Sequence, residues 1–580
     1  MKKILAIIFL MSGYLTAQTG IVNPLDKVRK IADRVIKETA FEFTNVKQKA
    51  APEVQVVEFS KTFNGQIGKG FAFSKIFVNG NMKLKYGVSY SMPIKIWVNG
   101  QLIFEKKKAV KFFYRETTTY LFKSNDTVTV NLTSGENRIV IESSLSGTPF
   151  VYLREVTERD MLMKSKFIPL DAEMNTTWAW AFLKVTPGML AGSGGYLRTT
   201  FVDSVYSGKF TNGLSFQYPP VNELKKLVIG KDNTFKKDSY ADWNYPNGAL
   251  MMVLLNLTDA SGDEKYHSFV KKYCEFINDN LPMLKKQYYS LHDLRGSYLR
   301  IFRKCMLDDA GAPVYPFAEI SLLDKRKDFI PLVKERADYV SKIQERLADG
   351  TLCRPEPERY TVWCDDLFMS TPLLLRAAKL FNDKKYYDDV VKQVVNFNKY
   401  LLDEKTGLYK HGWFSNKKEQ SKIFWGRANG WVIWAESEAL LMLPKNHPGY
   451  KKVEEIFKAN LNALIKYQDE SGIWHQVMDD KESFGETSCT AMFALGMARG
   501  IMNGNLDKSF AAPAFKAWKA IEEKISSDGI VKDICQGTGI GFDDRFYKTR
   551  ERFDNDPRGL GAVITAGIEI NKLQKFMKNN

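Results

Sequence analysis

Hydrophobic and polar positions alternate with a period of two between residues 53 and 155, which is typical of half-buried β-strands. Residues 94–98 and 101–104 are two such runs, and the dipeptide between them, Asn99-Gly100, favours a tight hairpin turn. Two further runs flank residues 134–136. Repeated short strands at this spacing predict a β-sandwich.

The apolar positions follow the helical period on both sides of this region. Residues 25–50 contain one short amphipathic stretch, with Val28, Ile31, Val35 and Ile36 on one face. From about residue 240 onward a longer pattern repeats: a helix ends in a polar turn, and an aromatic residue begins the next helix. These aromatic residues recur roughly every 60 positions: Tyr266, Phe329, Tyr386, Tyr450 and Phe510.

A repeat of this length that holds two helices is typical of a toroid of helical hairpins. The five hairpins and a C-terminal helix over residues 559–574 predict a ring of about six. In such a ring the inner helices are apolar, and the loops at one end form the pocket. The expected domains are a signal peptide over 1–17, a β-sandwich-like domain over 25–160, a connecting region over 161–239 and a helical barrel over 240–580.

The first residues are typical of an export signal. Lys2 and Lys3 precede an apolar core over residues 4–10, and small residues end at Ala17, where no cysteine lies nearby to accept a lipid. No later apolar stretch in the sequence is long enough to cross a bilayer. We therefore expect an exported protein, periplasmic or secreted, without a membrane span.

The formal net charge of +17 favours anionic partners. Lysine and arginine are spread along the whole chain and form no nucleic-acid motif, so a nucleic-acid partner is not expected. An anionic polysaccharide fragment fits better, and a solvated basic surface accounts for the charge equally well. The six cysteines show neither a zinc spacing nor a disulfide framework, and we expect no metal or other cofactor.

Chemically distinctive residues gather at the starts of the apolar helical stretches. Because each group holds the same place in its hairpin, we expect all of them at one mouth of the ring. An acidic residue at a helix start is most often a cap, so no single group is specific. The groups lie at 307–311, 363–366, 411–413, 425–431, 474–476 and 486–488.

Their chemistry suits a sugar acid. Asp365 and Asp366 lie side by side and are followed at once by core-type residues, where carboxylates are costly unless they are paired or functional. Arg427 offers a fork for a carboxylate, and Trp425 and Trp431 offer flat apolar faces for a sugar ring. His411 and His475 add polar groups to the same mouth.

These motifs resemble a known family. Residues 240–578 are similar to the unsaturated glucuronyl and rhamnogalacturonyl hydrolases of glycoside hydrolase families 88 and 105, and closer to family 105. The resemblance implies an (α/α)6 barrel, in agreement with the repeat, so the expected fold is mainly α with an N-terminal β-sandwich. The motifs that carry it are Trp-Cys-Asp-Asp-Leu-Phe-Met (363–369), Trp-Gly-Arg-Ala-Asn-Gly-Trp (425–431) and those at 472–480, 486–494 and 535–539.

The resemblance also implies a reaction. A polysaccharide lyase leaves a C4–C5 double bond in a uronate at the non-reducing end, and these enzymes hydrate that bond to release the sugar. Asp365 matches the residue that protonates C4 and then takes a proton from the attacking water. Asp309 matches a second Asp, which assists or binds the ring.

The expected binding residues are Trp363, His411, Trp425, Arg427, Trp431 and His475. The chain departs from the family at three positions: Asp366 stands where a small residue is usual, Ala310 where Cys is frequent and Ala428 where Gly is common. We expect burial under Trp363 and the neighbouring Asp366 to raise the pKa of Asp365.

Other functions fit the same residues. One is another carbohydrate enzyme with an α/α toroid, an inverting glycosidase or a polysaccharide lyase; another is a glycan-binding protein without activity. Rhamnogalacturonan and ulvan both yield the unsaturated end, so the resemblance favours rhamnose-containing uronate glycans without selecting one. The N-terminal region resembles modules attached to polysaccharide-degrading enzymes, where glycan binding and a spacer role are both open.

Overall fold

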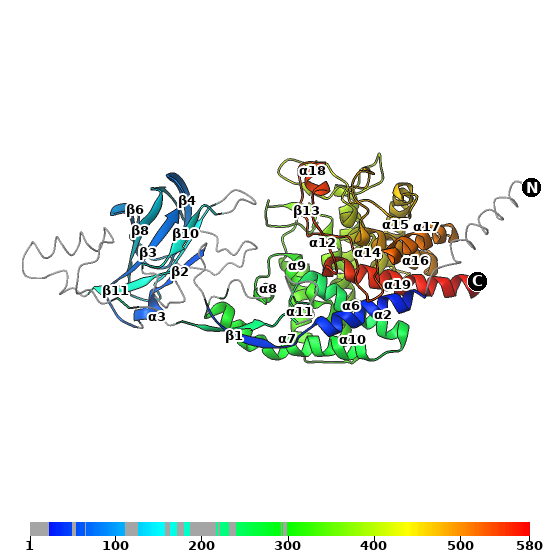
Figure 1. The fold of residues 1–580 in the computed structure, drawn as a ribbon, viewed down its shortest axis with the longest axis horizontal. Helices are drawn as coiled ribbons and strands as arrows, with labels where there is room; N and C mark the ends of the chain where they lie inside the picture. The colour runs from blue at the N-terminus through cyan, green and yellow to red at the C-terminus, as the bar shows by residue number, and fades with distance from the viewer. Residues whose placement is uncertain are drawn as a thin grey trace, which may run out of the picture. The chain divides into compact units, whose positions relative to one another are not determined.

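The computed structural model of the chain (Figure 1) describes residues 23–48, 54–63, 65–110, 126–156, 163–170, 179–185, 216–217, 221–230, 239–291, 293 and 298–579. The predicted signal peptide and most of the connecting region lie outside these residues. Contacts divide the chain into two units. One contains the described residues up to 43, those from 227 to 284 and those from 298 on; the other contains those from 44 to 226 and from 285 to 293.

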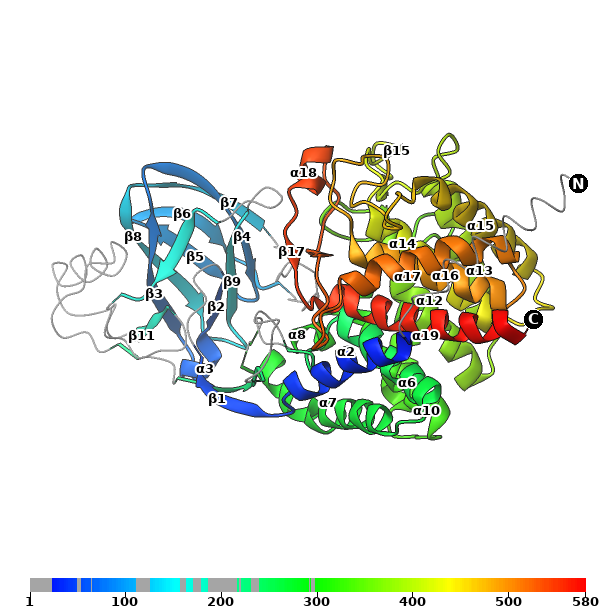
Figure 2. The same ribbon diagram turned by 45° about the vertical axis from the view of Figure 1, so that its right-hand side comes forward.

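The second unit consists mainly of two antiparallel sheets (Figure 2). The six-stranded sheet has the order β10-β3-β8-β5-β6, with β11 also paired to β3, and the four-stranded sheet has the order β2-β9-β4-β7. Their strands are β2 (Val54–Glu58), β3 (Lys69–Val78), β4 (Met82–Tyr90), β5 (Ile94–Val98), β6 (Gln101–Lys106), β7 (Asp126–Leu132), β8 (Gly135–Ser144), β9 (Phe150–Glu155), β10 (Ser165–Ile168) and β11 (Ala181–Val185).

The predicted hairpin at Asn99-Gly100 is present. Both residues have positive φ, 49° and 84°, which is the backbone of a two-residue turn between β5 and β6. The two runs on either side of residues 134–136 belong to different sheets. The first, β7, pairs with β4, whereas the second, β8, pairs with β3 and β5 in the other sheet. Apolar residues of both sheets form one hydrophobic core. A β-rich N-terminal region is thus confirmed, and the sandwich stays a prediction.

The first unit is a closed ring of inner helices. Each inner helix contacts the next, and the last, α19, contacts the first, α6. Because these helices pack on all sides, they are apolar around almost their whole circumference; every residue of α14 from 426 to 440 is buried. The inner helices are α6 (Tyr245–Ser261), α10 (Tyr315–Leu323), α12 (Asp365–Phe381), α14 (Gly426–Met442), α16 (Thr487–Met502) and α19 (Pro557–Asn579).

An outer helix accompanies each inner one. Five of them follow their inner partners in the sequence and begin at or next to the predicted aromatic residues, all of which are buried. They are α7 (Lys265–Tyr289), α11 (Ile330–Asp338), α13 (Lys385–Leu401), α15 (Tyr450–Leu464) and α17 (Ala511–Glu523). The predicted toroid of helical hairpins is therefore confirmed.

The sixth outer helix is α2 (Pro24–Glu38), from the other end of the sequence. It lies beside α19 (Figures 1 and 2) and contacts α19 and α6. Its predicted apolar face buries Val28, Ile31 and Val35 in the core of the helical unit. We expected this segment to group with the β-domain of 25–160, but its amphipathic face completes the toroid instead.

The end of the ring opposite the helix starts is closed by buried ion pairs. Arg376 of α12 binds Glu319 and Glu438, and Arg499 of α16 binds Glu438 and Glu569. Arg376, Glu438, Arg499 and Glu569 lie eleven or twelve residues into their helices, which at 1.5 Å per residue is roughly 17 Å from the start of each helix. A helix that could span a membrane is not found within the part of the chain that the structure describes.

Candidate active site

Two short strands bring the central residues together at the mouth of the ring. β13 (Thr361–Trp363) pairs antiparallel with β14 (Gly412–Phe414), so that Trp363 faces Gly412 across the pair. The Cys364 amide donates to the His411 carbonyl at 3.1 Å, and Asp365 then begins α12. This pairing carries His411 from a neighbouring repeat to the start of the helix that holds Asp365.

His411 contacts the proposed catalytic acid directly. Its Nε2 lies 3.3 Å from Asp365 Oδ2, and its Nδ1 lies 2.8 Å from the Tyr547 hydroxyl. The imidazole is fully buried in an aromatic box, with ring centroids 5.4 Å from Trp363, 4.6 Å from Trp425 and 5.8 Å from Tyr547. The Asp365 side chain is 13% exposed, so the carboxylate lies at the boundary between this box and solvent.

The pKa of Asp365 differs from our expectation. Burial raises it, but contact with His411 and the charge of Arg354 outweigh burial, and the pKa lies below its usual value. Burial lowers the pKa of His411 more than the nearby Asp365 raises it, so the imidazole is neutral near pH 7. The resting site therefore contains an ionised Asp365 beside a neutral His411.

Arg354 organises the other carboxylates of the mouth. Its Nη2 lies 2.8 Å from Asp366 Oδ1 and 3.2 Å from Asp308 Oδ1, and its guanidinium stacks 4.2 Å from the Trp363 ring centroid. Burial raises the pKa of Asp366 to about 7 in spite of Arg354, and burial also raises the pKa of Asp308. One arginine thus faces two carboxylates, which favours retention of a proton between them.

Asp309 is held apart from this group. It is buried in the short helix α9 (Leu307–Ala310), where Arg303 donates to its Oδ2 at 3.0 and 2.8 Å, and Arg300 lies 3.7 Å from its Oδ1. Its neighbour Asp308, rather than Asp309, shares Arg354 with Asp366. The sequence thus predicted a second carboxylate at this mouth. The structure places both Asp308 and Asp309 there, and each belongs to a different ion pair.

Arg427 forks onto the backbone. Its Nη1 donates to the Cys535 carbonyl and its Nη2 to the Gln536 carbonyl, each at 2.7 Å, while its guanidinium lies 5.0 Å from the Trp425 ring. It therefore fixes the segment that follows β16 (Ile534–Cys535) against the start of α14. Trp425 Nε1 in turn donates to Gln476 Oε1 at 3.1 Å.

Trp431 and His475 make their contacts with residues other than Asp365 and His411. Trp431 is buried in the ring, stacked 4.9 Å from Phe368 and 5.8 Å from Trp434. His475 belongs to its own loop, where Nε2 lies 3.1 Å from Asp469 Oδ2 and Nδ1 contacts the Ser483 carbonyl. Its neighbour Gln476, rather than His475, reaches the aromatic box.

Several buried polar atoms of this mouth lack a hydrogen-bond partner among the described residues. They come from five of the predicted site residues, and buried polar atoms of folded proteins are normally paired. The atoms are Trp363 Nε1, Asp365 Oδ2, His411 Nε2, Arg427 Nε and Trp431 Nε1. Asp365 Oδ2 and His411 Nε2 lie 3.3 Å apart and face each other, so the groups left for a polar ligand are the other three.

Sequence reasoning missed Arg354, Tyr547 and Gln476. Arg354 lies in an irregular segment ahead of the recognised motif, and no local pattern marks it. Tyr547, in the short helix α18 (Asp544–Lys548), follows the Cys-Gln-Gly-Thr-Gly motif by eight residues. Gln476 lies within the motif at 472–480 beside His475, and nothing in the local pattern favours the amide over the imidazole.

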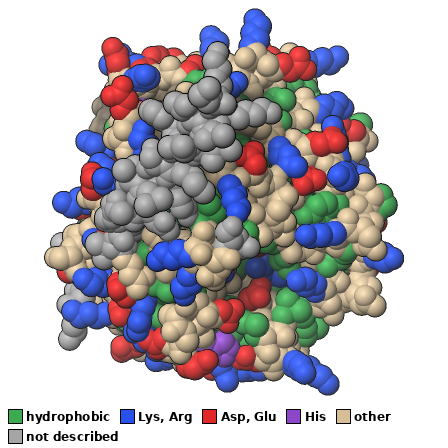
Figure 3. All heavy atoms as spheres, turned by 90° about the vertical axis from the view of Figure 1, so that its right-hand side faces the viewer, with side chains coloured by type: hydrophobic (Ala, Val, Ile, Leu, Met, Phe, Trp, Pro, Cys, Tyr) green, Lys and Arg blue, Asp and Glu red, His purple; other side chains and the backbone are tan. Residues whose placement is uncertain are grey.

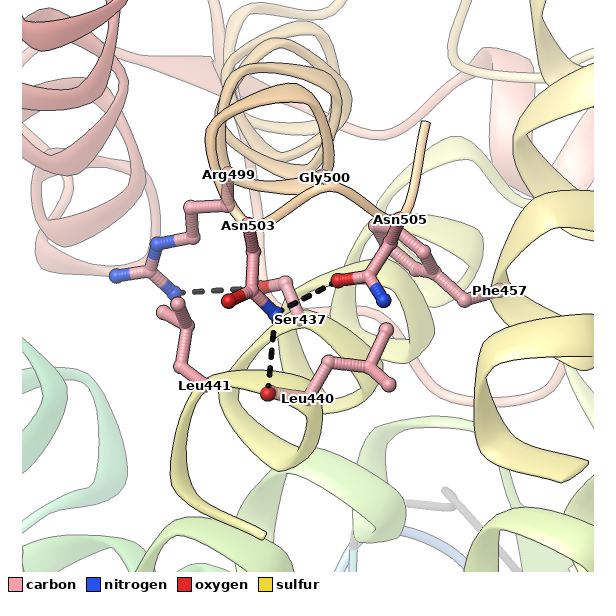
Figure 4. A pocket seen from close by; sticks show the side chains of 8 residues that line it. All are labelled: Ser437, Leu440, Leu441, Phe457, Arg499, Gly500, Asn503 and Asn505. Carbon is pink, nitrogen blue, oxygen red and sulfur yellow. Dashed lines mark hydrogen bonds between the residues drawn. The ribbon is translucent and has the colours of Figure 1, made fainter. Parts of the chain in front are cut away.

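Two other features of the helical unit do not compete with this site. A shallow pocket lies near Ser437, Arg499 and Asn503, whose polar groups are bonded to one another and to Leu440 and Asn505 (Figure 4). On the face drawn in Figure 3, basic side chains are scattered among acidic ones. Among the described residues, no three acids, histidines or cysteines lie close enough together to hold a metal ion.

Comparison with known proteins agrees with the geometry. Residues 224–574, more than half of the chain, match the profile of glycosyl hydrolase family 88. The chain belongs to this family.

Curated relatives of this family 88 chain carry closely related names. The unsaturated rhamnogalacturonyl hydrolase YesR of Bacillus subtilis is 28% identical over 363 residues, which cover 60% of this chain and 96% of YesR. An unsaturated 3S-rhamnoglycuronyl hydrolase of Formosa agariphila is 30% identical over 282 residues, covering 46% of this chain and 73% of the relative.

Solved structures share the fold of the family 88 chain. A possible member of family 105 from Klebsiella pneumoniae superposes with a TM-score of 0.51 at 22% identity, covering 61% of this chain and 86% of that protein. A family 105 glycoside hydrolase of C. acetobutylicum gives 0.50 at 23% identity, with coverages of 57% and 94%. At these identities the likeness concerns the fold alone.

Proposed function

We propose that this family 88 chain removes a 4,5-unsaturated uronic acid from the non-reducing end of polysaccharide-lyase products. The observation that carries the proposal is the contact of Asp365 with His411 in a buried aromatic box, beside polar atoms that lack partners. The names of the relatives support the same reaction class. A carboxylate beside aromatic side chains suits an acidic sugar ring.

The reaction proceeds by hydration of the enol ether. Asp365 in its acid form gives a proton to C4, water adds to C5, and Asp365 takes a proton from that water. The product is a hemiketal at C5, which opens and releases the rest of the oligosaccharide. Overall one water is added across the double bond, and Asp365 ends in the protonation state in which it began.

Asp365 must gain a proton before this step. The bound uronate brings a second negative charge next to Asp365 and displaces water from it, and both changes raise the pKa of a carboxyl group. Asp366, with its pKa raised to about 7, is an adjacent group that holds a proton near neutral pH. Substrate binding itself thus favours the acid form of Asp365.

The other predicted residues keep roles in the proposal. Trp363 and Trp425 contact the sugar ring, Asp309 assists or binds it, and Arg427, Trp431 and His475 act on the uronate and its neighbour. Arg427 donates N–H groups of both terminal nitrogens to backbone carbonyls, and its Nε lacks a partner among the described residues, so the Nε–H is a donor for a ligand. The proposed substrates are rhamnose-containing uronate glycans of the rhamnogalacturonan or ulvan type, and the proposed location is outside the cytoplasm.

The test is the ultraviolet absorbance of the unsaturated uronate. Purified protein is mixed with oligosaccharides from lyase-treated rhamnogalacturonan, ulvan and glycosaminoglycan, and the absorbance should fall as the double bond is hydrated. A polysaccharide lyase would instead raise the absorbance of intact polysaccharide, and an inverting glycosidase would leave it unchanged. Binding without any change would identify a glycan-binding protein, and no fall on any substrate contradicts the proposal.

A further inference from the structure

The Tyr547 hydroxyl lies between a backbone N–H and a histidine ring nitrogen. The Gly541 backbone N–H donates to the Tyr547 hydroxyl oxygen at 3.0 Å. The same oxygen lies 2.8 Å from His411 Nδ1. An amide N–H cannot accept a hydrogen bond, whereas a ring nitrogen of a neutral imidazole can. Of these two neighbours, His411 is therefore the one to which Tyr547 can donate.

This arrangement has a consequence for the other ring nitrogen. A neutral imidazole carries one N–H, and if Nδ1 accepts a proton from Tyr547 the hydrogen must be on Nε2. That nitrogen lies 3.3 Å from Asp365 Oδ2. An Nε2–H facing an ionised carboxylate is favourable, whereas a bare Nε2 lone pair facing it would be repulsive.

The surroundings hold Tyr547 in place. Its side chain is fully buried, its ring lies 5.3 Å from Phe546 and 6.4 Å from Trp425, and its backbone carbonyl accepts a bond from Gln476. Ile540, beside Gly541, packs with Trp363 and Phe414 in a small cluster at the mouth. The loop that supplies the Gly541 donor thus packs on Trp363, one of the rings that surround His411.

We infer that Tyr547 is a positioning residue, whose hydroxyl favours the Nε2–H tautomer of His411 and so places an N–H group 3.3 Å from the Asp365 carboxylate. Its effect on turnover rests on the proposed function, because only then is Asp365 the acid. The effect on the tautomer of His411 does not depend on any activity. Gly541 contributes through its backbone and Tyr547 through one oxygen atom.

The tautomer is measured by nuclear magnetic resonance of protein labelled with 15N-histidine. The chain has five histidines, so the His411 signal is identified by its disappearance in His411→Gln. Wild-type protein at neutral pH should show the Nε2–H tautomer at this residue. A wild-type His411 that carries its proton on Nδ1, or on both nitrogens, would overturn the inference without need of any Tyr547 variant.

Tyr547→Phe removes the hydroxyl and keeps the ring. We expect the His411 signal to shift toward a mixture of tautomers, and turnover of the unsaturated substrate to fall about 10- to 100-fold, with KM changed less than about twofold. Tyr450→Phe is the matched control, because the Tyr450 hydroxyl accepts from Asn503 and Asn505 at the far end of the ring. It should change neither the signal nor turnover.

The two proposals fail in different ways. If no lyase product is hydrated but His411 shows the expected tautomer and its dependence on Tyr547, the proposed function alone is wrong. If turnover is present and Tyr547→Phe leaves the His411 tautomer unchanged, the positioning role of Tyr547 is wrong.

Discussion

Arg354 Nη2 lies 2.8 Å from Asp366 Oδ1, and both side chains are buried at the mouth of the helical ring. The family that this chain resembles usually has a small residue at the position of Asp366. Asp366 is thus an additional carboxyl group next to the proposed acid. Its buried partner is the guanidinium of Arg354. Arg354 also contacts Asp308 and stacks on Trp363, so one side chain links three residues of the mouth.

Arg354→Gln should destabilise the protein by about 3–5 kcal/mol, because it leaves two carboxylates at the mouth without their cation. The control is Arg359→Gln. Arg359 is 62% exposed and pairs with Glu345, so its loss should cost less than about 1 kcal/mol. Denaturant unfolding of both variants gives the two free energies, and equal values would contradict a structural role for the Arg354 cluster.

Asp366 should make stability depend on pH. In the folded protein its pKa is raised to about 7, whereas in the unfolded chain it titrates near about 4. The folded state holds the proton of Asp366 more tightly than the unfolded chain does. The resulting contribution to the free energy of unfolding is therefore complete below about pH 4 and is lost as the pH rises to about 7. Asp366→Asn does not ionise, so its stability relative to wild type should rise across this window, by up to about 1.4 kcal/mol per pH unit.

Denaturant unfolding at several pH values measures that difference. Asp259→Asn is the control, because Asp259 is exposed near the end of α6, and its curve should run parallel to that of wild type. A constant difference between Asp366→Asn and wild type from pH 4 to pH 8 would refute the raised pKa.

Asp365→Asn tests the proposed acid. The amide is nearly isosteric but cannot deliver a proton, so turnover of the unsaturated substrate should fall at least about 100-fold while binding is retained. Absorbance at saturating substrate and calorimetric titration of the same oligosaccharide measure the two effects. Asp259→Asn again serves as the control, because Asp259 is exposed and lies fourteen residues from the start of its helix. If Asp365→Asn loses binding alone, a catalytic role of Asp365 is contradicted.

The features that could be predicted are those set by local rules. The turn at Asn99-Gly100 needs only positive φ at two residues, and the repeated aromatic residues mark helix starts through a pattern of about 60 residues. The partners of Arg427 could not be predicted, because the carbonyls of Cys535 and Gln536 lie more than one hundred residues away in sequence. The role of Arg354 could not be predicted for the same reason. Its partners Asp308, Trp363 and Asp366 belong to α9, β13 and α12, which meet only when the ring closes.

The packing of α2 on the helical unit is open to a direct test. Val28 is fully buried, and a Cβ placed on Gly567 of α19 would lie 2.4 Å from Val28 Cγ1, so the two helices are in close contact. Val28→Asp should therefore lower the free energy of unfolding by about 2–5 kcal/mol. Asp26→Asn, on the exposed side of the same helix, should change it by less than about 1 kcal/mol. If thermal unfolding shows similar losses of stability in Val28→Asp and Asp26→Asn, the packing of α2 on α19 is contradicted.

Asp308 and Asp309, the two acids of α9, allow the role implied by the family resemblance to be tested. The resemblance assigns the assisting role to Asp309, yet Asp309 is bound by Arg303 and Arg300, whereas Asp308 faces the arginine that Asp366 also binds. If the assignment is right, Asp309→Asn should lower turnover by about 10- to 100-fold. Asp308→Asn should lower it much less, since Asp366 still pairs with Arg354. The two variants differ by one position in the same short helix, so each controls for the other. A larger loss in Asp308→Asn would transfer the assisting role to Asp308, and equal small losses would leave Asp365 as the one carboxylate needed for the reaction.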